Sequence, residues 1–345
     1  MSTLAAPFEI AGEAIAPGQR ALIPLPAAQL HSHDAPLVLP VHVVHGRRPG
    51  PVLFVSAAIH GDEVNGVEII RRLLAQRHSR LQGTLLALPV VNGLGYMQRA
   101  RYLPDGRDLN RSFPGSSRGS VAARLASRFF EEVVVRSDFG IDLHTGSGER
   151  ENLPQIRANL DDAETRRLAL AFGVPVVIHS SVRDGSLREA ASERGIPTLL
   201  YEAGSALQFS EVAIRLGLRG VLRTMRQIGM LPAQANTTDQ RPVFLARSRR
   251  WLRSPCAGAA HMRKRIGDSV SEGETLAQIY DPYDLFSGTV ETVTAPKDGV
   301  IVGINRCPTV YEGDALLHIA EHDEALDIAE EVEAMRRQML AQPPV

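Results

Sequence analysis

The chain has 345 residues, enough for about two domains at roughly 150 residues each. Its 44% hydrophobic and 22% charged residues are ordinary for a globular protein and exclude a disordered or low-complexity chain. Thirty-eight basic residues against 39 acidic ones give a formal charge of -1, without the basic excess that phosphate-backbone binding needs, so we expect no nucleic-acid partner.

Cysteine content and apolar patterning indicate where the protein works. Cys256 and Cys307 are the only cysteines, which disfavours both a disulfide scaffold and a cysteine-rich zinc site. The N-terminal segment lacks a basic region followed by an apolar core, and no apolar run reaches the roughly 20 residues of a membrane span. We therefore expect a cytoplasmic protein with no membrane partner.

Strand-like and helix-like segments alternate over the first two thirds of the chain. Short β-prone runs, 37–44 among them, precede a continuous apolar run, 52–56, that predicts a buried strand. The predicted elements that follow are helix 65–74, strand 84–91, helix 121–135, strand 139–144, helix 162–172, strand 175–179, strand 198–202 and helix 211–228. This order predicts an α/β sheet covered by helices on both faces.

For the polar stretch 147–160 we predict a loop that shapes specificity, with Arg150 and Arg157 as substrate contacts or as surface charge.

A second domain follows a polar, turn-rich segment near residues 232–242. We predict an α/β catalytic domain over 1–235, a β-rich domain over 236–325, and a helix and tail over 326–345. Short strands separated by Gly-Asp and Glu-Gly turns make the second domain resemble biotinyl/lipoyl-like domains. Its hairpin DPYDLFSGTVETV has no lysine for covalent attachment, so we expect a structural or gating role. The apolar stripe of the last helix is typical of packing on its own domain, and with the β-strand edges it allows a homo-oligomer.

Polar residues follow two of the predicted buried strands, where α/β proteins place their ligands. His60 and Glu63 come after strand 52–56 at a spacing that lets an imidazole and a carboxylate face one cation. His144 ends strand 139–144, and together the three form the His-Glu-His set typical of catalytic zinc. Asp142, two residues earlier, lies on the same side of an ideal strand as His144 and either orients its imidazole or caps a turn.

Two further segments carry candidate catalytic groups. Glu202 directly follows the apolar strand TLLY, at a position suited to a general base. The loop RYLPDGRDLNRSFPG holds Asn110 and Arg111, neighbouring donors suited to gripping a carboxylate. Arg101 in the same loop could neutralise an oxyanion, although Arg99 and Arg107 compete for that role.

Four ordered motifs resemble the succinylglutamate desuccinylase/aspartoacylase family, a branch of the zinc carboxypeptidase-like fold. They are His60-Gly-Asp-Glu63, Asp108-Leu-Asn-Arg111-Ser-Phe-Pro-Gly, Asp142-Leu-His144 and Tyr-Glu202-Ala-Gly. The resemblance spans roughly residues 40 to 320 and implies a mixed sheet flanked by helices. It also implies one Zn²⁺ per chain on His60, Glu63 and His144, with Glu202 as general base and acid. Arg101 would then polarise the scissile carbonyl, while Asn110 and Arg111 would hold the substrate carboxylate.

The function implied is zinc-dependent hydrolysis of a small N-acyl amino acid of acetyl or succinyl type. One alternative is a zinc carboxypeptidase that removes C-terminal residues such as glutamate from peptides. A second domain that closes over the cleft would favour small substrates, and an open groove would favour peptides. A non-catalytic binding module on the same fold is the other alternative. The acyl group and the amino acid stay open.

Overall fold

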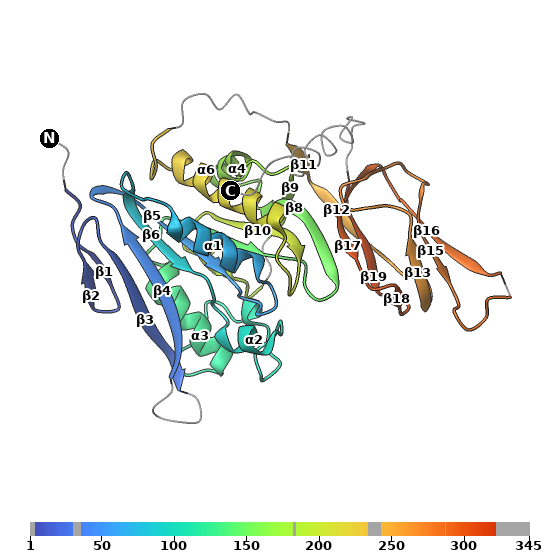
Figure 1. Ribbon diagram of the computed structural model, residues 1–345, viewed down its shortest axis with the longest axis horizontal. Helices are drawn as coiled ribbons and strands as arrows, with labels where there is room; N and C mark the ends of the chain where they lie inside the picture. The colour runs from blue at the N-terminus through green and yellow to red at the C-terminus, as the bar shows by residue number, and fades with distance from the viewer. Residues whose placement is uncertain (1–3, 30–35, 182–183, 234–242, 287, 322–345) are drawn as a thin grey trace.

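The computed structural model describes residues 4–29, 36–181, 184–233, 243–286 and 288–321. Helices flank a large mixed sheet, and a smaller β-rich domain stands at one end of that sheet (Figure 1). The predicted α/β architecture is therefore confirmed, with parallel and antiparallel strands in one sheet.

The large sheet is built around four parallel strands. Its main run has the strand order β3-β4-β6-β5-β7-β10-β8, in which β5, β6, β7 and β10 are parallel and the outer strands antiparallel. The bounds are β3 Arg20–Gln29, β4 Pro36–His45, β5 Arg48–Ala57, β6 Gln82–Leu88, β7 Phe139–His144, β8 Arg150–Ala158 and β10 Thr198–Ser205. A separate hairpin joins β1 (Phe8–Ile10) and β2 (Glu13–Ile15). The parallel strands are buried on both faces, which explains why their continuous apolar runs predicted them.

The stretch after His144, predicted as a loop, is instead strand β8. One edge of β8 pairs with β10, while its other edge pairs first with β17 (Gly299–Asn305) and then with β9 (Val176–His179). Its charged residues and Pro154 interrupt any apolar alternation, so its sequence reads as a loop. Hydrogen bonding to strands on both edges holds this segment as a strand, although its sequence lacks the apolar periodicity of one.

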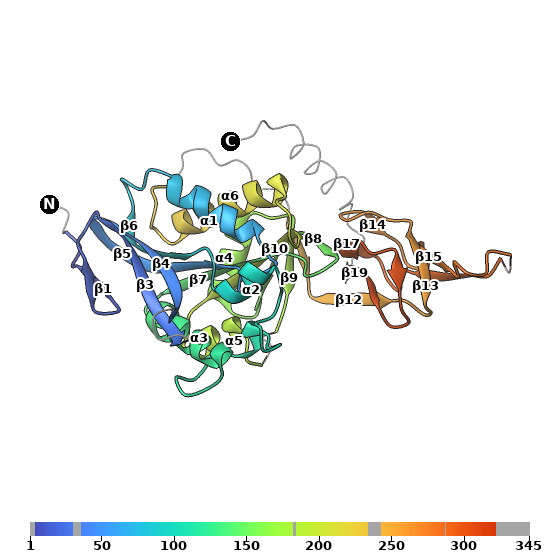
Figure 2. The same cartoon turned by 60° about the horizontal axis from the view of Figure 1, so that its bottom comes forward.

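Helices cover both faces of the sheet, as predicted (Figure 2). One face carries α1 (Asn65–Ala75), α4 (Ala163–Phe172) and α6 (Glu211–Gln227), whose apolar residues share one core. The other face carries α3 (Val121–Phe129), which continues as a π-helical turn, Phe130–Val134, and α5 (Leu187–Glu193). Two short helices, α2 (Gly93–Gln98) and α5, have too few turns for their periodicity to predict them.

The second domain is β-rich, as predicted. Strands β12, β19 and β17 continue the large sheet through β8, and a four-stranded sheet, β16-β15-β13-β18, packs against them around a small apolar core. The bounds are β12 Ser248–Arg253, β13 Gly258–Met262, β14 Ser269–Val270, β15 Thr275–Tyr280, β16 Val290–Thr294, β18 Thr309–Val310 and β19 Ala315–Glu321. Its likeness to biotinyl/lipoyl-like domains stays a prediction.

Strand β11 (Phe244–Ala246) pairs with β9, so the chain extends the large sheet before it enters the second domain. The predicted boundary at 235/236 and the predicted helix and tail over 326–345 lie outside the described residues. Within the described part of the chain, Cys256 and Cys307 are free thiols. None of the helices described there is long and apolar enough to span a membrane.

Candidate active site

The candidate residues meet at the carboxyl ends of the parallel strands, as the α/β rule predicts. His60 lies in the loop between β5 and α1, and His144 is the last residue of β7. In β10, Glu202 stands directly opposite His144 in the strand register. Residues that are 58 to 142 positions apart in the chain are therefore brought to one edge of the sheet.

His60, Glu63 and His144 form a buried group that could hold a metal ion. Their ligand atoms lie within 4.8 Å of one another. Nδ1 of His60 is 2.8 Å from Oε1 of Glu63, and Nδ1 of His144 is 2.8 Å from Oε2 of the same carboxylate. Burial opposes ionisation of Glu63, but the charges of the two imidazoles outweigh it and lower the pKa of Glu63 well below its usual range. Two imidazoles and one carboxylate, converging and buried, fit Zn²⁺ chemistry.

Each imidazole is held from behind by another carboxylate. Nε2 of His60 lies 3.1 Å from Asp108, and Nε2 of His144 lies 2.6 Å from Asp142, which also accepts a 2.8 Å hydrogen bond from Ser56. These contacts fix the ring orientations and leave both Nδ1 atoms facing Glu63. The contact expected of Asp142 is present. Asp108 was missed as a partner of His60, although it begins the motif that carries Asn110 and Arg111.

Of the three competing arginines, Arg101 lies at the histidine-glutamate group. Its guanidinium is 3.3 Å from Glu63 and 3.0 Å from Asp108, and it also donates to Ser147. Arg107 instead pairs with Asp105 at 2.8 Å, and Arg99 is exposed at the end of α2. The hydroxyl of Ser147 donates to Glu63 at 2.6 Å, a contact that the sequence analysis did not foresee.

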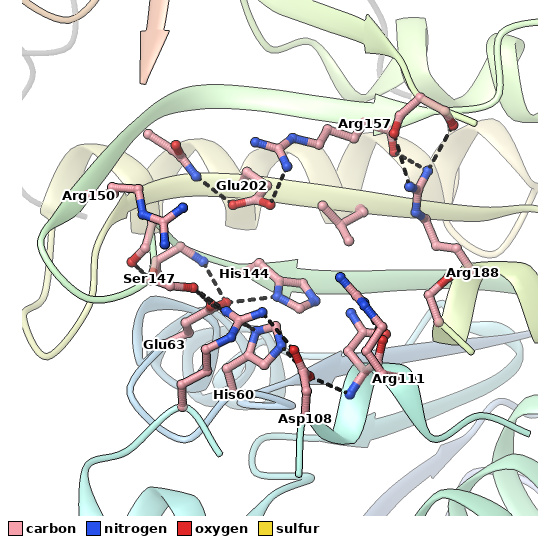
Figure 3. A pocket seen from close by; sticks show the side chains of 18 of the residues that line it. His60, Glu63, Asp108, Arg111, His144, Ser147, Arg150, Arg157, Arg188 and Glu202 are labelled. Carbon is pink, nitrogen blue, oxygen red and sulfur yellow. Dashed lines mark hydrogen bonds and ion pairs between the residues drawn. The ribbon is translucent and has the colours of Figure 1, made fainter. Parts of the chain in front are cut away.

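Glu202 is buried and held by two donors from β8 (Figure 3). The amide of Asn152 donates to one carboxylate oxygen at 2.6 Å, and the guanidinium of Arg157 lies 3.2 Å from the other. Asn110 is fixed as well, because its side-chain oxygen accepts a 2.9 Å hydrogen bond from the backbone of Leu187 at the start of α5.

These side chains line one cavity of about 330 Å³. Seven of the eight predicted site residues border it, and Asp142 lies behind His144. The second domain contributes Arg249 and Trp251 from β12, which the sequence analysis missed because neither belongs to a motif. Six of the lining residues are arginines, namely Arg101, Arg111, Arg150, Arg157, Arg188 and Arg249. Three are carboxylates, namely Glu63, Asp108 and Glu202, so the cavity wall carries a formal excess of three positive charges.

The fold and this cavity define an α/β protein with a candidate metal centre at the ends of its parallel strands. The sequence model of the succinylglutamate desuccinylase/aspartoacylase catalytic domain matches residues 49–228. The chain is 30% identical over 319 residues to N-alpha-acetyl-L-2,4-diaminobutyric acid deacetylase of Halomonas elongata, a match that covers 89% of this chain and 93% of that enzyme. It is also 30% identical over 191 residues to succinylglutamate desuccinylase of Photorhabdus laumondii, with 46% of this chain and 54% of that enzyme covered.

Solved structures agree with the sequence matches. A succinylglutamate desuccinylase/aspartoacylase from Rhodobacter sphaeroides superimposes with a TM-score of 0.77 at 25% identity, covering 88% of this chain and 95% of its own. The product-bound ectoine utilization protein EutE from Ruegeria pomeroyi has the same fold, with a TM-score of 0.79 at 21% identity over 88% of this chain and 95% of its own. The chain belongs to the succinylglutamate desuccinylase/aspartoacylase family and is an amidohydrolase.

Proposed function

We propose that this protein is a zinc-dependent deacylase that hydrolyses the amide bond of a small, acidic N-acyl amino acid. The observation that carries the proposal is the buried group of His60, Glu63 and His144 beside Glu202 in one arginine-rich cavity. The family membership reported above supports the same reaction class.

His60, Glu63 and His144 would hold one zinc ion per chain. Both Nδ1 atoms and the Glu63 carboxylate converge, and the carboxylates behind the rings orient them for ligation. When bound there, zinc would supply a Lewis acid and activate water for attack at neutral pH.

Side chains of this protein would carry out the proton transfers and hold the substrate. Glu202 accepts a proton from the attacking water and gives it to the amine nitrogen as the amide bond breaks. Arg101 donates to the acyl oxygen as negative charge develops there. Asn110 and Arg111 hold the carboxylate of the amino acid, so that the amide lies beside the metal ligands.

The size and charge of the cavity favour a small acidic substrate. Arg249 and Trp251 bring the second domain to the cavity wall, an arrangement that favours N-acyl amino acids over peptides and speaks against the carboxypeptidase alternative. The excess of positive charge favours a substrate with a second carboxylate. The relative from Halomonas elongata is named for diaminobutyric acid, whose side-chain amine is cationic at neutral pH. We infer that this chain instead prefers an N-acyl amino acid whose side chain is negatively charged.

The metal centre can be tested with one variant. We expect His144→Ala to lose stoichiometric zinc and to lose hydrolysis of N-acyl amino acids, because one of three ligands is missing. Metal content by elemental mass spectrometry and amine release measure the two effects, and wild-type protein stripped of metal by a chelator gives the reference. A His144→Ala protein that keeps one zinc per chain and full activity would refute the ligand set. Wild-type protein that takes up no metal would instead favour the non-catalytic binding module.

A further inference from the structure

The Glu202 carboxylate is gripped at both oxygens by one neighbouring strand. Asn152 and Arg157 stand in β8 opposite Gly204 and Leu200, the residues two positions to either side of Glu202. They are thus its diagonal neighbours across the antiparallel pair, close enough for their side chains to reach it. Asn152 Nδ2 donates to Oε2 at 2.6 Å, and Arg157 Nη1 lies 3.2 Å from Oε1.

An irregularity in the pairing of β8 with β10 makes this grip possible, because β8 has one residue more than β10 between the paired positions. The strand register shifts between Glu202 and Gly204, so Asn152 lies three residues from Gln155, the residue opposite Glu202, instead of two. Gly204 of β10, opposite the bulge, has φ +75°, and a Cβ there would lie 2.6 Å from the Asn65 side chain, so glycine suits this position. The bulge therefore brings Asn152 and Arg157 to the same carboxylate.

A buried carboxylate needs such partners. Glu202 is only 8% exposed, and burying a carboxylate without a partner is costly, so the contacts with Arg157 and Asn152 offset the cost of its burial. Each carboxylate oxygen has two lone pairs, so one donor on each leaves room for a water molecule or an amine proton. The two donors also fix the side-chain torsions, which a general base needs for a reproducible approach to its proton.

We propose that Arg157 and Asn152 are positioning residues that hold the Glu202 carboxylate aimed into the cavity. This inference rests on the proposed function, because it assigns Glu202 the proton transfers of amide hydrolysis. Arg157 thereby acts through Glu202 and does not bind the substrate. Loss of either donor should lower kcat and leave KM and metal content nearly unchanged.

The test compares Arg157→Gln, Arg157→Lys, Arg157→Ala and Asn152→Ala with wild-type protein loaded with zinc. We expect kcat to fall about 30-fold in Arg157→Gln, with KM within about twofold of wild type and one metal per chain. Arg157→Lys should lose less, since it keeps a positive donor, and added methylguanidine should restore part of the activity of Arg157→Ala. The matched control is Arg306→Gln, which breaks the ion pair of Arg306 with Glu151 of β8 outside the cavity and should leave kcat unchanged.

The outcomes separate this inference from the proposed function. An increase in KM at unchanged kcat in Arg157→Gln would make Arg157 a substrate-binding residue and overturn the positioning role. Equal losses in the Lys and Gln variants, without rescue by methylguanidine, would also overturn it, while wild-type hydrolysis would still uphold the deacylase. A structural readout does not depend on activity. In crystals of Arg157→Gln the Glu202 carboxylate should leave its wild-type position, and an unmoved carboxylate would contradict the inference. If Arg157→Gln does not fold, Arg157→Lys and Asn152→Ala carry the same kinetic test.

Discussion

At the level of single residues, contacts with neighbouring side chains fix the orientation of the main polar groups of the candidate site. The imidazoles of His60 and His144 each have Nε2 against a carboxylate, and Glu202 has one donor on each oxygen. Such contacts restrict the side chains when the protein folds, so their entropic cost does not fall on substrate binding. The side chains are then already oriented when a substrate binds.

Replacing Glu202 with Gln separates chemistry from metal binding. The amide keeps the size of the side chain but cannot accept the proton, so we expect kcat to fall by about 10²- to 10⁴-fold. Zinc content should stay at one per chain because Glu202 is not among the grouped ligands. Steady-state kinetics and elemental analysis on the same preparation check both. A variant with near-normal turnover would remove Glu202 from the role of general base.

Asp108 lies 3.1 Å from Nε2 of His60, so in the proposed metal site its loss should weaken metal binding without removing a ligand. We expect Asp108→Ala to lower zinc affinity by about 10- to 100-fold, measured by competition with a chelating indicator. Asp105→Ala is the matched control, because Asp105 lies in the same loop and pairs only with exposed Arg107 among the described residues. Equal zinc affinity in the two variants would contradict the role given to Asp108.

How much of the site the sequence predicts depends on whether a residue belongs to a local motif. The metal-facing residues follow predicted strand ends, so their meeting could be expected from the α/β rule. Arg157 is predicted from the sequence as a substrate contact or as surface charge in a loop, because its strand and its register against Glu202 are not visible in the sequence. Trp251 and Arg249 enter the cavity through the packing of the second domain, which no spacing in the sequence encodes.

At the scale of elements, strand β8 connects the catalytic sheet to the second domain. It pairs with β10, which carries Glu202, and with β17 of the second domain. Buried central strands could be predicted because burial on both faces demands continuous apolar runs. Strand β8 could not be predicted in this way, because it is held in place by pairing with strands distant in the sequence. Several of its residues are polar because they line the cavity.

The helices on one face are tied together by ion pairs that respond to pH. Glu68 of α1 accepts hydrogen bonds from Arg71 and Arg72, and Arg72 also pairs with Glu211 of α6 at 2.8 Å. Hydrogen bonding from Arg71, with a further contribution from Arg72, lowers the pKa of Glu68 from 4.5 to about 2. Because the pKa is lowered in the folded state, this stabilisation is fully present above about pH 4.5 and is lost as the pH falls toward 2.

We therefore expect Glu68→Gln to lower the free energy of unfolding by about 1 kcal/mol at pH 7, a value that allows for solvent screening. The difference from wild type should shrink between pH 4.5 and 3 as Glu68 approaches protonation. Chemical denaturation of both proteins at pH 7, 4 and 3 measures it. A difference that is the same at pH 3 as at pH 7 would show that the ion pairs do not carry the effect.

At the scale of the whole molecule, charge is distributed unevenly. The chain as a whole has a formal charge of -1, yet the cavity wall holds six arginines against three carboxylates. Composition excluded nucleic acid as an expected partner but could not show this local excess, because the arginines come from separate segments of both domains. A small acidic substrate would be attracted to such a cavity and held there. The cytoplasmic location and the homo-oligomer stay predictions.

A single incubation with a mixed pool of substrates distinguishes a deacylase from a carboxypeptidase. Zinc-loaded protein is incubated with a mixed pool of N-acetyl and N-succinyl derivatives of acidic, neutral and cationic amino acids, together with short peptides ending in glutamate, and the products are identified by mass spectrometry. We predict release of acetate or succinate with a free amino acid, fastest from the acidic members of the pool and absent after removal of the metal. Release of C-terminal glutamate from the peptides, with the N-acyl amino acids left intact, would contradict the proposed deacylase activity and favour a carboxypeptidase.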